Sequence, residues 1–329
     1  MFNYFPPQAY LGLTYFCNLK CKHCYVNKKT MKDISKTRIK RLIKELADLG
    51  VFKIVFTHGE SLIRRDVFEI ISFCYNLDID TTLITNGLLL NNEYAKKLKK
   101  AKVTRIVISF DSLSKKYHNN LRGRSDSWDG AISAMNNCRN NGLKFGLNVT
   151  INKSNHRSLE KIILFAIEKG AQDIYFLTIR ANKGYDIGQK GFLNKYPGII
   201  YKLWGLKQKY KSKIDLAFHD PLAIPSLAGK IKQSEMKSVL VENQCQAGRS
   251  WISIKPTGEI NPCNFLSLNL GNAYRSGIKN IWENIDLKNF MLSPKICYSC
   301  VHKKTCKGGC KSFCASSGDK DWRCNLLFK

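Results

Sequence analysis

Three cysteines stand close together near the start of the chain, in the stretch CNLKCKHC. Cys17, Cys21 and Cys24 have the spacing C-x3-C-x2-C, and the next cysteine is Cys74. Cysteine thiolates bind zinc or iron–sulfur clusters in proteins. A structural zinc site takes four ligands, whereas three cysteines around a cube of four irons leave one iron for another ligand. The spacing therefore predicts a metal centre with an open position.

A second group of cysteines lies near the C-terminus, where eight of the thirteen cysteines fall between residues 245 and 324. They are Cys245, Cys263, Cys297, Cys300, Cys306, Cys310, Cys314 and Cys324. Thirteen is an odd number, so complete pairing in disulfides is excluded. Cys74 and Cys138 stand alone in helical patterns, and we expect both to be small buried apolar side chains.

The elements that must position these residues alternate between strand and helix. Apolar runs predict strands at 9–16, 53–57, 81–85, 104–110, 144–151 and 173–179. Helical periodicity predicts helices at 34–50, 66–77, 92–101, 128–142 and 158–170. This alternation predicts an α/β fold with a parallel sheet. Six units are fewer than the eight of a closed barrel, so an open partial barrel and a doubly wound sheet both stay open.

Polar motifs follow the predicted strands. The cysteine loop follows the first strand, HGE (58–60) the second, NG (86–87) the third, and SFD (109–111) closes the fourth. Ligands of parallel β/α sheets bind at the carboxyl ends of the strands. We therefore expect these motifs to meet there, although turns carry Gly, Asn and Ser in any case.

After residue 185 the alternation gives way to a predicted helix at 196–211, a short strand at 215–220 and a cysteine-rich end. We predict two domains, 1–212 and 213–329. The formal net charge of +29 favours an anionic partner, or reflects a solvated lysine-rich surface. The chain starts without the pattern of a signal peptide and has no apolar run long enough to span a membrane, so we expect a cytoplasmic protein.

The three-cysteine motif after a first strand resembles the signature of the radical SAM superfamily. The resemblance implies a partial (β/α)6 barrel in which Cys17, Cys21 and Cys24 hold a 4Fe–4S cluster. It also implies that S-adenosylmethionine (SAM) binds the open iron and is cleaved by one electron to a 5′-deoxyadenosyl radical, which abstracts a hydrogen from a substrate. An external donor such as flavodoxin or ferredoxin would supply that electron.

Other positions resemble SAM-binding motifs of the same superfamily. The implied cofactor-binding residues are His58, Gly59, Glu60, Asn86, Ser109 and Arg122. His58 and Ser61 depart from the Gly-Gly-Glu-Pro-type motif that the superfamily carries after the second strand.

The C-terminal cysteines resemble the SPASM extension, which usually holds two auxiliary 4Fe–4S clusters. Carried over by position, the resemblance implies Cys245, Cys263 and Cys310 for auxiliary cluster I, and Cys297, Cys300, Cys306 and Cys324 for auxiliary cluster II. Together with the SAM cluster this makes three clusters.

Two features depart from the usual SPASM pattern. No cysteine stands shortly before Cys245, so cluster I is open at one iron or uses Glu242. Cys314 is additional: it is a ligand in place of Cys324, a fourth ligand of cluster I, or a free thiol that donates hydrogen.

The resemblance implies a ribosomally made peptide as the substrate, which would be oxidised, crosslinked or epimerised, and the basic charge favours an acidic one. Asn264 stands where sulfatase-maturing relatives carry an aspartate base, which disfavours that branch. The alternatives are a small-molecule enzyme that oxidises an aminocyclitol or modifies a tetrapyrrole side chain, and a zinc-ribbon protein that binds nucleic acid. No catalytic base is assigned, and His118, His219 and Tyr185 are candidates by polarity alone.

Overall fold

The computed structural model describes residues 5–26, 33–179, 192, 195–266, 268–284, 294–317 and 324. A ten-stranded sheet runs through them in the order β10-β9-β8-β1-β2-β3-β4-β5-β6-β7. The strands are β1 (Gln8–Gly12), β2 (Lys53–Thr57), β3 (Asp80–Thr85), β4 (Arg105–Ser109), β5 (Phe145–Ile151), β6 (Asp173–Thr178), β7 (Asp215–Phe218), β8 (Trp251–Ile254), β9 (Glu259–Asn261) and β10 (Gly271–Asn272). Every pairing from β8 through β1 to β7 is parallel, and β9 and β10 add an antiparallel edge.

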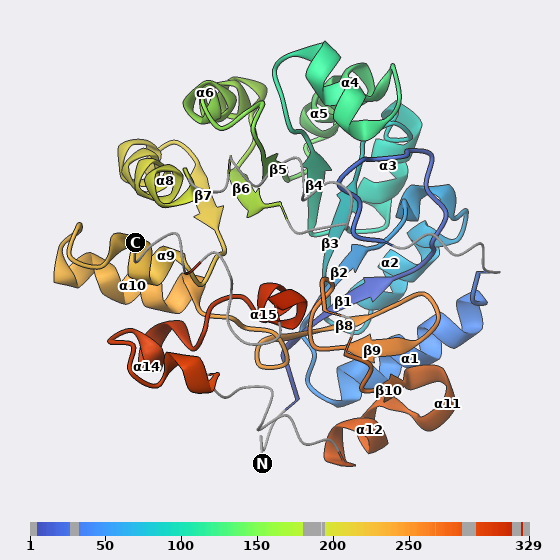
Figure 1. Cartoon of the computed structure of the whole chain (residues 1–329). Coiled ribbons are helices and arrows are strands. Elements are labelled where there is room, and N and C mark those ends of the chain that lie inside the picture. The colour runs from blue at the N-terminus through green and yellow to red at the C-terminus, as the bar shows by residue number, and fades with distance from the viewer. Residues whose placement is uncertain are drawn as a thin grey trace.

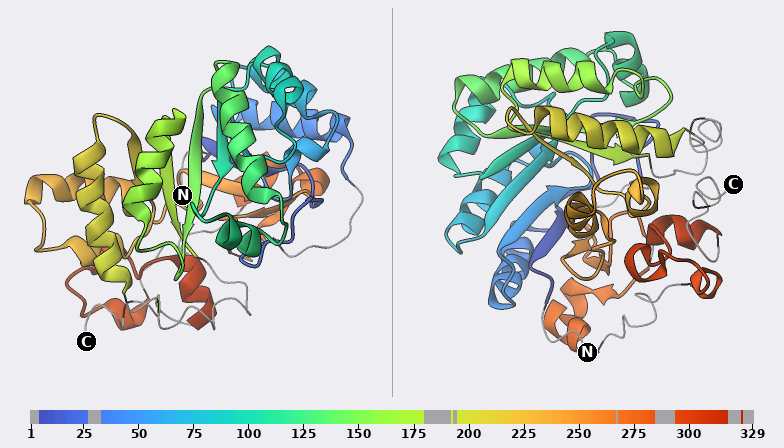
Figure 2. Two further views of the ribbon diagram at one scale, coloured as in Figure 1. Left: turned by 90° about the horizontal axis from the view of Figure 1, so that it is seen from above. Right: turned by 90° about the vertical axis from the view of Figure 1, so that its left-hand side faces the viewer.

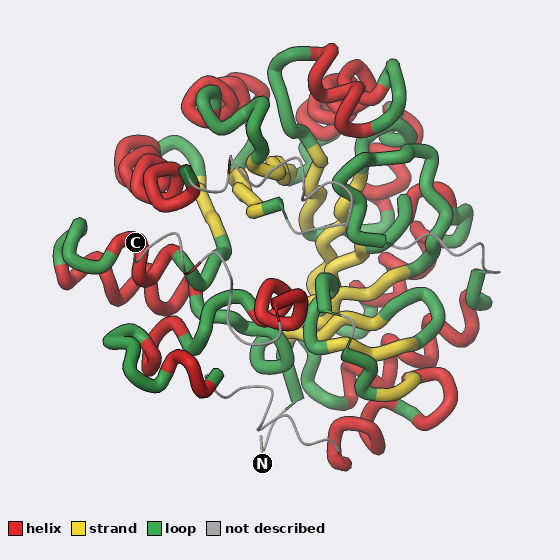
Figure 3. Tube along the Cα trace, in the orientation of Figure 1, coloured by secondary structure: helices red, strands yellow, loops and turns green. Residues whose placement is uncertain are grey.

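Helices follow most of the strands. They are α1 (Lys36–Asp48), α2 (Val67–Tyr75), α3 (Asn92–Lys100), α4 (Lys115–Arg122), α5 (Ser127–Asn140), α6 (Leu159–Lys169), α8 (Tyr196–Tyr210), α9 (Ala223–Leu227), α10 (Gln233–Asn243), α11 (Ala273–Ser276), α12 (Ile278–Asn284), α14 (Lys303–Cys306) and α15 (Lys311–Ser317). Figures 1 and 3 show the strands as an open arc with the longer helices along its outer side. In Figure 2 (left), α14 and α15 lie by the arrow tips of the strands, at the carboxyl ends of the sheet.

Helix α1 shows how the sequence specifies these elements. The Ser35 side chain accepts a hydrogen bond from the N–H of Arg38 and caps the first turn. Apolar residues recur every three or four positions and bury one face of the helix. The buried residues are Ile39, Leu42, Ile43 and Leu46.

The predicted fold class is confirmed. All six predicted strands exist, and the sheet is an open, partial barrel. Cys74 and Cys138 are fully buried apolar residues, as expected, and burial raises the pKa of each thiol to about 12.

The sheet continues beyond the predicted elements. β7 pairs in parallel with β6, and β8 pairs in parallel with β1 on the other side of the arc. The cysteine-rich end is thus hydrogen-bonded to the first strand, while a division into domains at residue 212 stays a prediction. Helix α4 was not predicted, because its buried face carries His118 and Arg122 beside Leu121 and has no apolar periodicity.

A partly buried ion pair crosses the start of the sheet. Arg105 and Asp173 begin β4 and β6 and form their ion pair across β5, which lies between them. Gly146 in β5 provides the space for this ion pair, because a Cβ atom at that position would lie 1.8 Å from Oδ1 of Asp173. The Arg105 guanidinium also lies 5.3 Å from the ring centre of Tyr175.

None of the helices in the described part of the chain combines the length and the apolar character needed to cross a membrane.

Candidate functional site

The cysteine loop leaves β1 at its carboxyl end. Cys17, Cys21 and Cys24 are all half-buried there. The loop has little regular structure of its own, so its shape depends on contacts with the turns that follow β2, β3 and β4.

The turn after β2 holds the start of the loop. The backbone N–H of Glu60 donates to the carbonyl oxygen of Phe16 at 2.8 Å. Gly59 has φ +42°, and a Cβ atom there would lie 2.5 Å from the carbonyl oxygens of both Thr14 and Phe16. Only glycine permits this close backbone approach.

The end of α4 holds the middle of the loop. The N–H of Lys22 donates to the carbonyl oxygen of Leu121 at 2.9 Å. Gly123, at φ +69°, ends the helix so close to Lys20 that a Cβ atom would lie 2.4 Å from the Lys20 carbonyl oxygen. Arg124 then donates to the Asn18 carbonyl oxygen at 3.3 Å.

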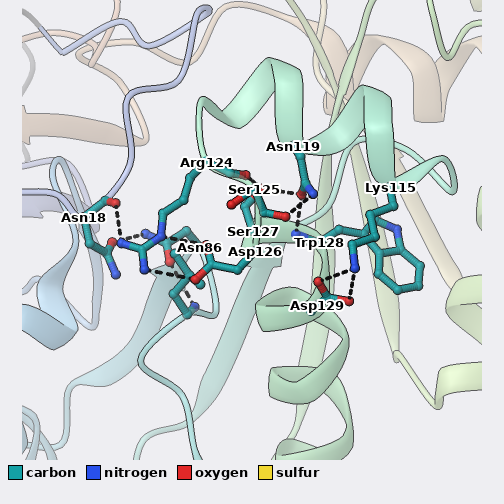
Figure 4. Close-up of polar contacts among 11 residues, drawn as sticks. Asn18, Asn86, Lys115, Asn119, Arg124, Ser125, Asp126, Ser127, Trp128 and Asp129 are labelled. Atoms are coloured by element: carbon teal, nitrogen blue, oxygen red, sulfur yellow. Dashed lines mark hydrogen bonds and ion pairs between the residues drawn. The ribbon is translucent and has the colours of Figure 1, made fainter.

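Asn18 also receives a contact from the turn after β3. The Asn86 side-chain amide donates to Oδ1 of Asn18 at 2.7 Å and approaches Sγ of Cys17 at 4.0 Å. Figure 4 shows Asn18 contacted by both Arg124 and Asn86. The figure also shows Asn119 bound to the start of α5 through Ser127 and Trp128, which fixes the α4–α5 turn.

The carboxylate of Glu60 is engaged with the turn after β3. It accepts hydrogen bonds from the Thr85 hydroxyl at 3.0 Å and from the backbone N–H groups of Asn86 at 2.8 Å and Leu62 at 3.2 Å. Burial raises the pKa of Glu60, and these hydrogen bonds oppose the rise. In this arrangement Glu60 orients Asn86 toward the cysteine loop.

A buried ion pair lies on the other side of the loop. Arg122 donates to Oδ2 of Asp111 through Nε at 2.7 Å and through Nη2 at 2.6 Å. Its Nη1 approaches Sγ of Cys21 at 4.0 Å. Burial alone would raise the pKa of Asp111, but the Arg122 guanidinium and two histidines hold it below its usual range.

The remaining predicted cofactor residues lie at the same end of the sheet. Ser109 closes β4, is half-buried and pairs with Asn148 of β5. His58 is buried at φ +60° between the rings of Tyr15 and Tyr25. Burial, and then the charge of Lys255, lowers the pKa of His58 to about 4, so the ring is neutral near pH 7.

Cys297 and Cys314 both lie at a glycine turn in the C-terminal region. Gly308, at φ +85°, would place a Cβ atom 2.5 Å from Cδ of Pro294 and 3.8 Å from Sγ of Cys297. The Cys314 thiol donates to the Gly308 carbonyl oxygen at 3.2 Å, one helical turn beyond Cys310. Of the eight cysteines in this region, four are buried and the other four are half-buried. The buried ones are Cys297, Cys306, Cys310 and Cys314.

The residues present fit iron–sulfur clusters. Their donor atoms are thiols, and the N–H of Phe265 points at Sγ of Cys263 at 3.5 Å, a contact of the kind that surrounds cluster sulfurs. Within the described ranges, no three Cys, His, Asp or Glu side chains are gathered tightly enough to hold a single metal ion. A cube of four irons holds its thiolates farther apart than one ion does.

Several other predicted roles receive a structural context. His118 is buried against Phe110 and accepts a hydrogen bond from the N–H of Asp111, which is a packing role. His219 contacts the Glu242 carbonyl oxygen through Nδ1 at 2.7 Å. The Glu242 carboxylate pairs with Lys207 at 2.5 Å. Tyr185 lies outside the described residues.

The sequence predicted most of the site residues but not the residues that they contact. It placed Asp111 at the end of the fourth strand but gave it no partner, and it did not single out Asn18, Tyr25 or Phe265. No local pattern marks Asn18, Tyr25 or Phe265, because their contacts come from segments far away in the chain.

Comparison with known proteins identifies two domains in the chain. Residues 11–166 match the radical SAM superfamily, and residues 245–311 match the SPASM iron–sulfur cluster-binding domain. An AdoMet-dependent heme synthase from Methanosarcina barkeri is 26% identical over 329 residues, covering 93% of this chain and 92% of that protein. Mycofactocin maturase MftC from Mycolicibacterium smegmatis is 27% identical over 315 residues, covering 91% of this chain and 76% of that protein.

The fold is similar to that of Streptococcus suis SuiB bound to S-adenosylmethionine, with a TM-score of 0.79 and 22% identity. That match covers 95% of this chain and 74% of SuiB. The two domain matches support the binding of SAM and of iron–sulfur clusters by this chain. The chain belongs to the radical SAM superfamily and carries a SPASM domain at its C-terminal end.

Proposed function

We propose that this radical SAM enzyme abstracts a hydrogen atom from a peptide and so oxidises, crosslinks or epimerises it. The observation that carries the proposal is the cysteine loop at the carboxyl ends of the strands, where Cys17 approaches Asn86, Cys21 approaches Arg122 and all three thiols are half-buried. When bound, the cluster and SAM would supply a 5′-deoxyadenosyl radical, and an external donor of the flavodoxin or ferredoxin class would supply the electron.

The residues of the site would have different roles. Cys17, Cys21 and Cys24 would hold the SAM cluster, and Arg122 would face the carboxylate of SAM. Glu60 already accepts hydrogen bonds at both carboxylate oxygens, so its role would be to hold Asn86 in place. His58, Gly59 and Ser109 would complete the pocket. His58 would do so as a neutral ring.

We assign the C-terminal cysteines to two auxiliary clusters, which makes three 4Fe–4S clusters in all. Cluster I would use Cys245, Cys263 and Cys310, and cluster II would use Cys297, Cys300, Cys306 and Cys324. The contact between Cys314 and the glycine turn supports a place for Cys314 beside these ligands, either as a further ligand or as a hydrogen donor.

Two relatives support a peptide substrate: a mycofactocin maturase, and SuiB, which has been solved with its precursor peptide SuiA. The basic charge supports an acidic one. An open groove of about 900 Å³ between α2 and α3 suits such a peptide. Its lining includes Lys40, Arg65, Lys97, Lys100, Phe68 and Tyr94. Glu69 and Glu93 also line it, but they pair with Lys36 and Lys97, which leaves a net positive rim over aromatic rings.

The test begins with iron and acid-labile sulfide after anaerobic reconstitution of the wild type and of Cys17→Ala/Cys21→Ala/Cys24→Ala. Three clusters correspond to about twelve irons, and the triple variant should keep about eight and lose all SAM cleavage. Acidic peptides are then screened for stimulation of 5′-deoxyadenosine release. A wild-type chain that holds zinc and little iron would contradict the proposal and favour the zinc-ribbon, nucleic-acid alternative.

A second function is favoured by one observation: heme synthases match nearly the whole chain, with 26% identity in one archaeal relative. The basic surface would then bind the carboxylates of a tetrapyrrole. Iron–coproporphyrin is the probe, in the same SAM-cleavage assay. Stimulation by the porphyrin and by none of the peptides would select this function over the first, whereas aminocyclitols have no comparable support.

A further inference from the structure

Phe265 contacts three segments that each carry predicted cluster ligands. Its backbone N–H points at Sγ of Cys263 at 3.5 Å. Its carbonyl oxygen accepts a hydrogen bond from the Ser312 hydroxyl at 2.8 Å. Its ring packs on Tyr25 with the centroids 4.8 Å apart and the planes tilted by 58°. Phe265 thus joins the stretch after β9, helix α15 and the N-terminal cysteine loop.

Tyr25 is a fixed partner for this ring. It directly follows Cys24, and its hydroxyl is hydrogen-bonded to the Thr57 hydroxyl at the end of β2, at 3.0 Å. Its ring meets the His58 ring in a T-shaped arrangement, with the centroids 5.7 Å apart. Tyr25 is therefore held by the barrel on two sides, and the Phe265 ring has a defined surface to pack on.

Ser312 connects Phe265 to the C-terminal cysteines. It lies on α15, two residues after Cys310 and two before Cys314. Its hydrogen bond reaches 47 residues back along the chain to Phe265. A displacement of Phe265 would therefore displace both Cys263 and helix α15.

We propose that Phe265 is the positioning residue that sets the auxiliary-cluster cysteines at a fixed place relative to the SAM-cluster loop. The proposal rests on the proposed function, because it needs clusters at both sets of cysteines. Aromatic pairs have preferred geometries, so the ring defines an orientation as well as a contact. Hydrogen bonds to the sulfurs of a cluster help to set its reduction potential, so the Phe265 N–H would couple this position to the potential of cluster I.

The test compares Phe265→Leu, Phe265→Tyr and Ser312→Ala in the full-length, reconstituted protein. Phe52→Leu and Ser276→Ala are the matched controls, since both residues are exposed and distant in sequence from the cysteines. Iron content, dithionite-driven SAM cleavage, and the EPR signals and midpoint potentials of the reduced clusters are measured for each. Pulsed EPR reports the dipolar interaction between the SAM cluster and its nearest auxiliary neighbour.

We expect Phe265→Leu to keep its iron but to broaden the distribution of dipolar couplings and to shift one auxiliary midpoint potential. Ser312→Ala should change both quantities in the same sense by less, and Phe265→Tyr, which keeps the ring, should match the wild type. Unchanged EPR signals and potentials in Phe265→Leu and Ser312→Ala, with full iron, would overturn the positioning role alone. If Phe265→Leu loses iron, the dipolar couplings and the midpoint potentials of Ser312→Ala test the positioning role instead. A wild type without iron would overturn the proposed function itself, and this inference with it.

Discussion

Arg122 and Asp111 form a charged pair beside the cysteine loop, and both are nearly inaccessible to solvent. Their side chains are 10% and 0% exposed. Removing one partner of a buried pair leaves the other charge desolvated and uncompensated. The pair therefore matters less for its own attraction than for what its loss would leave behind.

We predict that Asp111→Asn lowers the free energy of unfolding by about 3 kcal/mol, because Arg122 stays buried without its carboxylate. Arg122 would also lose its orientation toward Cys21, so SAM should bind more weakly. Urea unfolding and a SAM-binding titration measure the two effects. The control is Asp48→Asn, which breaks the exposed pair with Lys44 and should leave both stability and SAM binding nearly unchanged. Equal losses in the two variants would contradict the prediction.

His118 makes a prediction about pH. Burial lowers its pKa to about 4; the Asp111 carboxylate opposes this shift and the Arg122 guanidinium adds to it, whereas the ring has a pKa near 6.5 in an unfolded chain. Between pH 6.5 and pH 4, His118 is therefore protonated in the unfolded chain and neutral in the folded chain. The contribution of His118 to stability is complete above pH 6.5 and is lost progressively as the pH falls from 6.5 toward 4.

The neutral, buried His118 should lower the free energy of unfolding by about 1 kcal/mol at pH 6 relative to pH 7.5. Urea unfolding of the wild type and of His118→Asn at the two pH values isolates the effect. We expect the variant to lose less stability between pH 7.5 and pH 6 than the wild type does. An identical loss in both proteins would assign the acid sensitivity to other groups.

At the scale of elements, the cysteine loop is shaped by neighbouring turns more than by its own sequence. Gly59 after β2 and Gly123 at the end of α4 bring backbone against backbone at distances that no other residue allows. Such contacts fix the loop before any cofactor binds, which reduces the ordering that binding must supply.

We predict that Gly123→Ala displaces the loop, because the new Cβ atom would lie 2.4 Å from the Lys20 carbonyl oxygen. The variant should lose iron from the N-terminal cluster while it keeps the iron of the C-terminal ones, as measured by iron analysis and EPR. Gly50→Ala is the control: it also has a left-handed φ, +84°, but its Cβ atom would meet nothing within 4 Å. Full iron content in Gly123→Ala would show that the loop tolerates the shift.

At the scale of the whole molecule, the excess of lysine and arginine gives a formal net charge of +29. A field of this size raises the rate at which anionic ligands arrive and is screened by salt. If the substrate is an acidic peptide, its affinity should fall as the ionic strength rises.

We predict that Arg65→Glu/Lys100→Glu, in the α2–α3 groove, weakens binding of an acidic peptide about tenfold at low salt. Lys211→Glu/Lys213→Glu is the control, because these residues line a different pocket beside α8. Both double variants lower the formal net charge from +29 to +25. Fluorescence titrations at two ionic strengths separate local from global effects, and equal weakening in both variants would exclude the groove as the binding surface.

The sequence by itself determined the local features of this protein. Helical periodicity and apolar runs depend on neighbours a few positions apart, so the six strands and their crossover helices could be predicted. The C-x3-C-x2-C spacing and the C-terminal cysteines lie in short stretches and identified the superfamily. Which cysteine binds which cluster is still a prediction.

The tertiary structure decided what depends on distant segments. Helix α4 was missed because its buried face is polar, and it is stabilised by the ion pair of Arg122 with Asp111. The packing of Tyr25 on Phe265 joins residues 240 positions apart, and no periodicity in either segment records it. Local patterns report which face of an element is apolar, whereas a polar site is assembled by contacts that only the folded chain brings together.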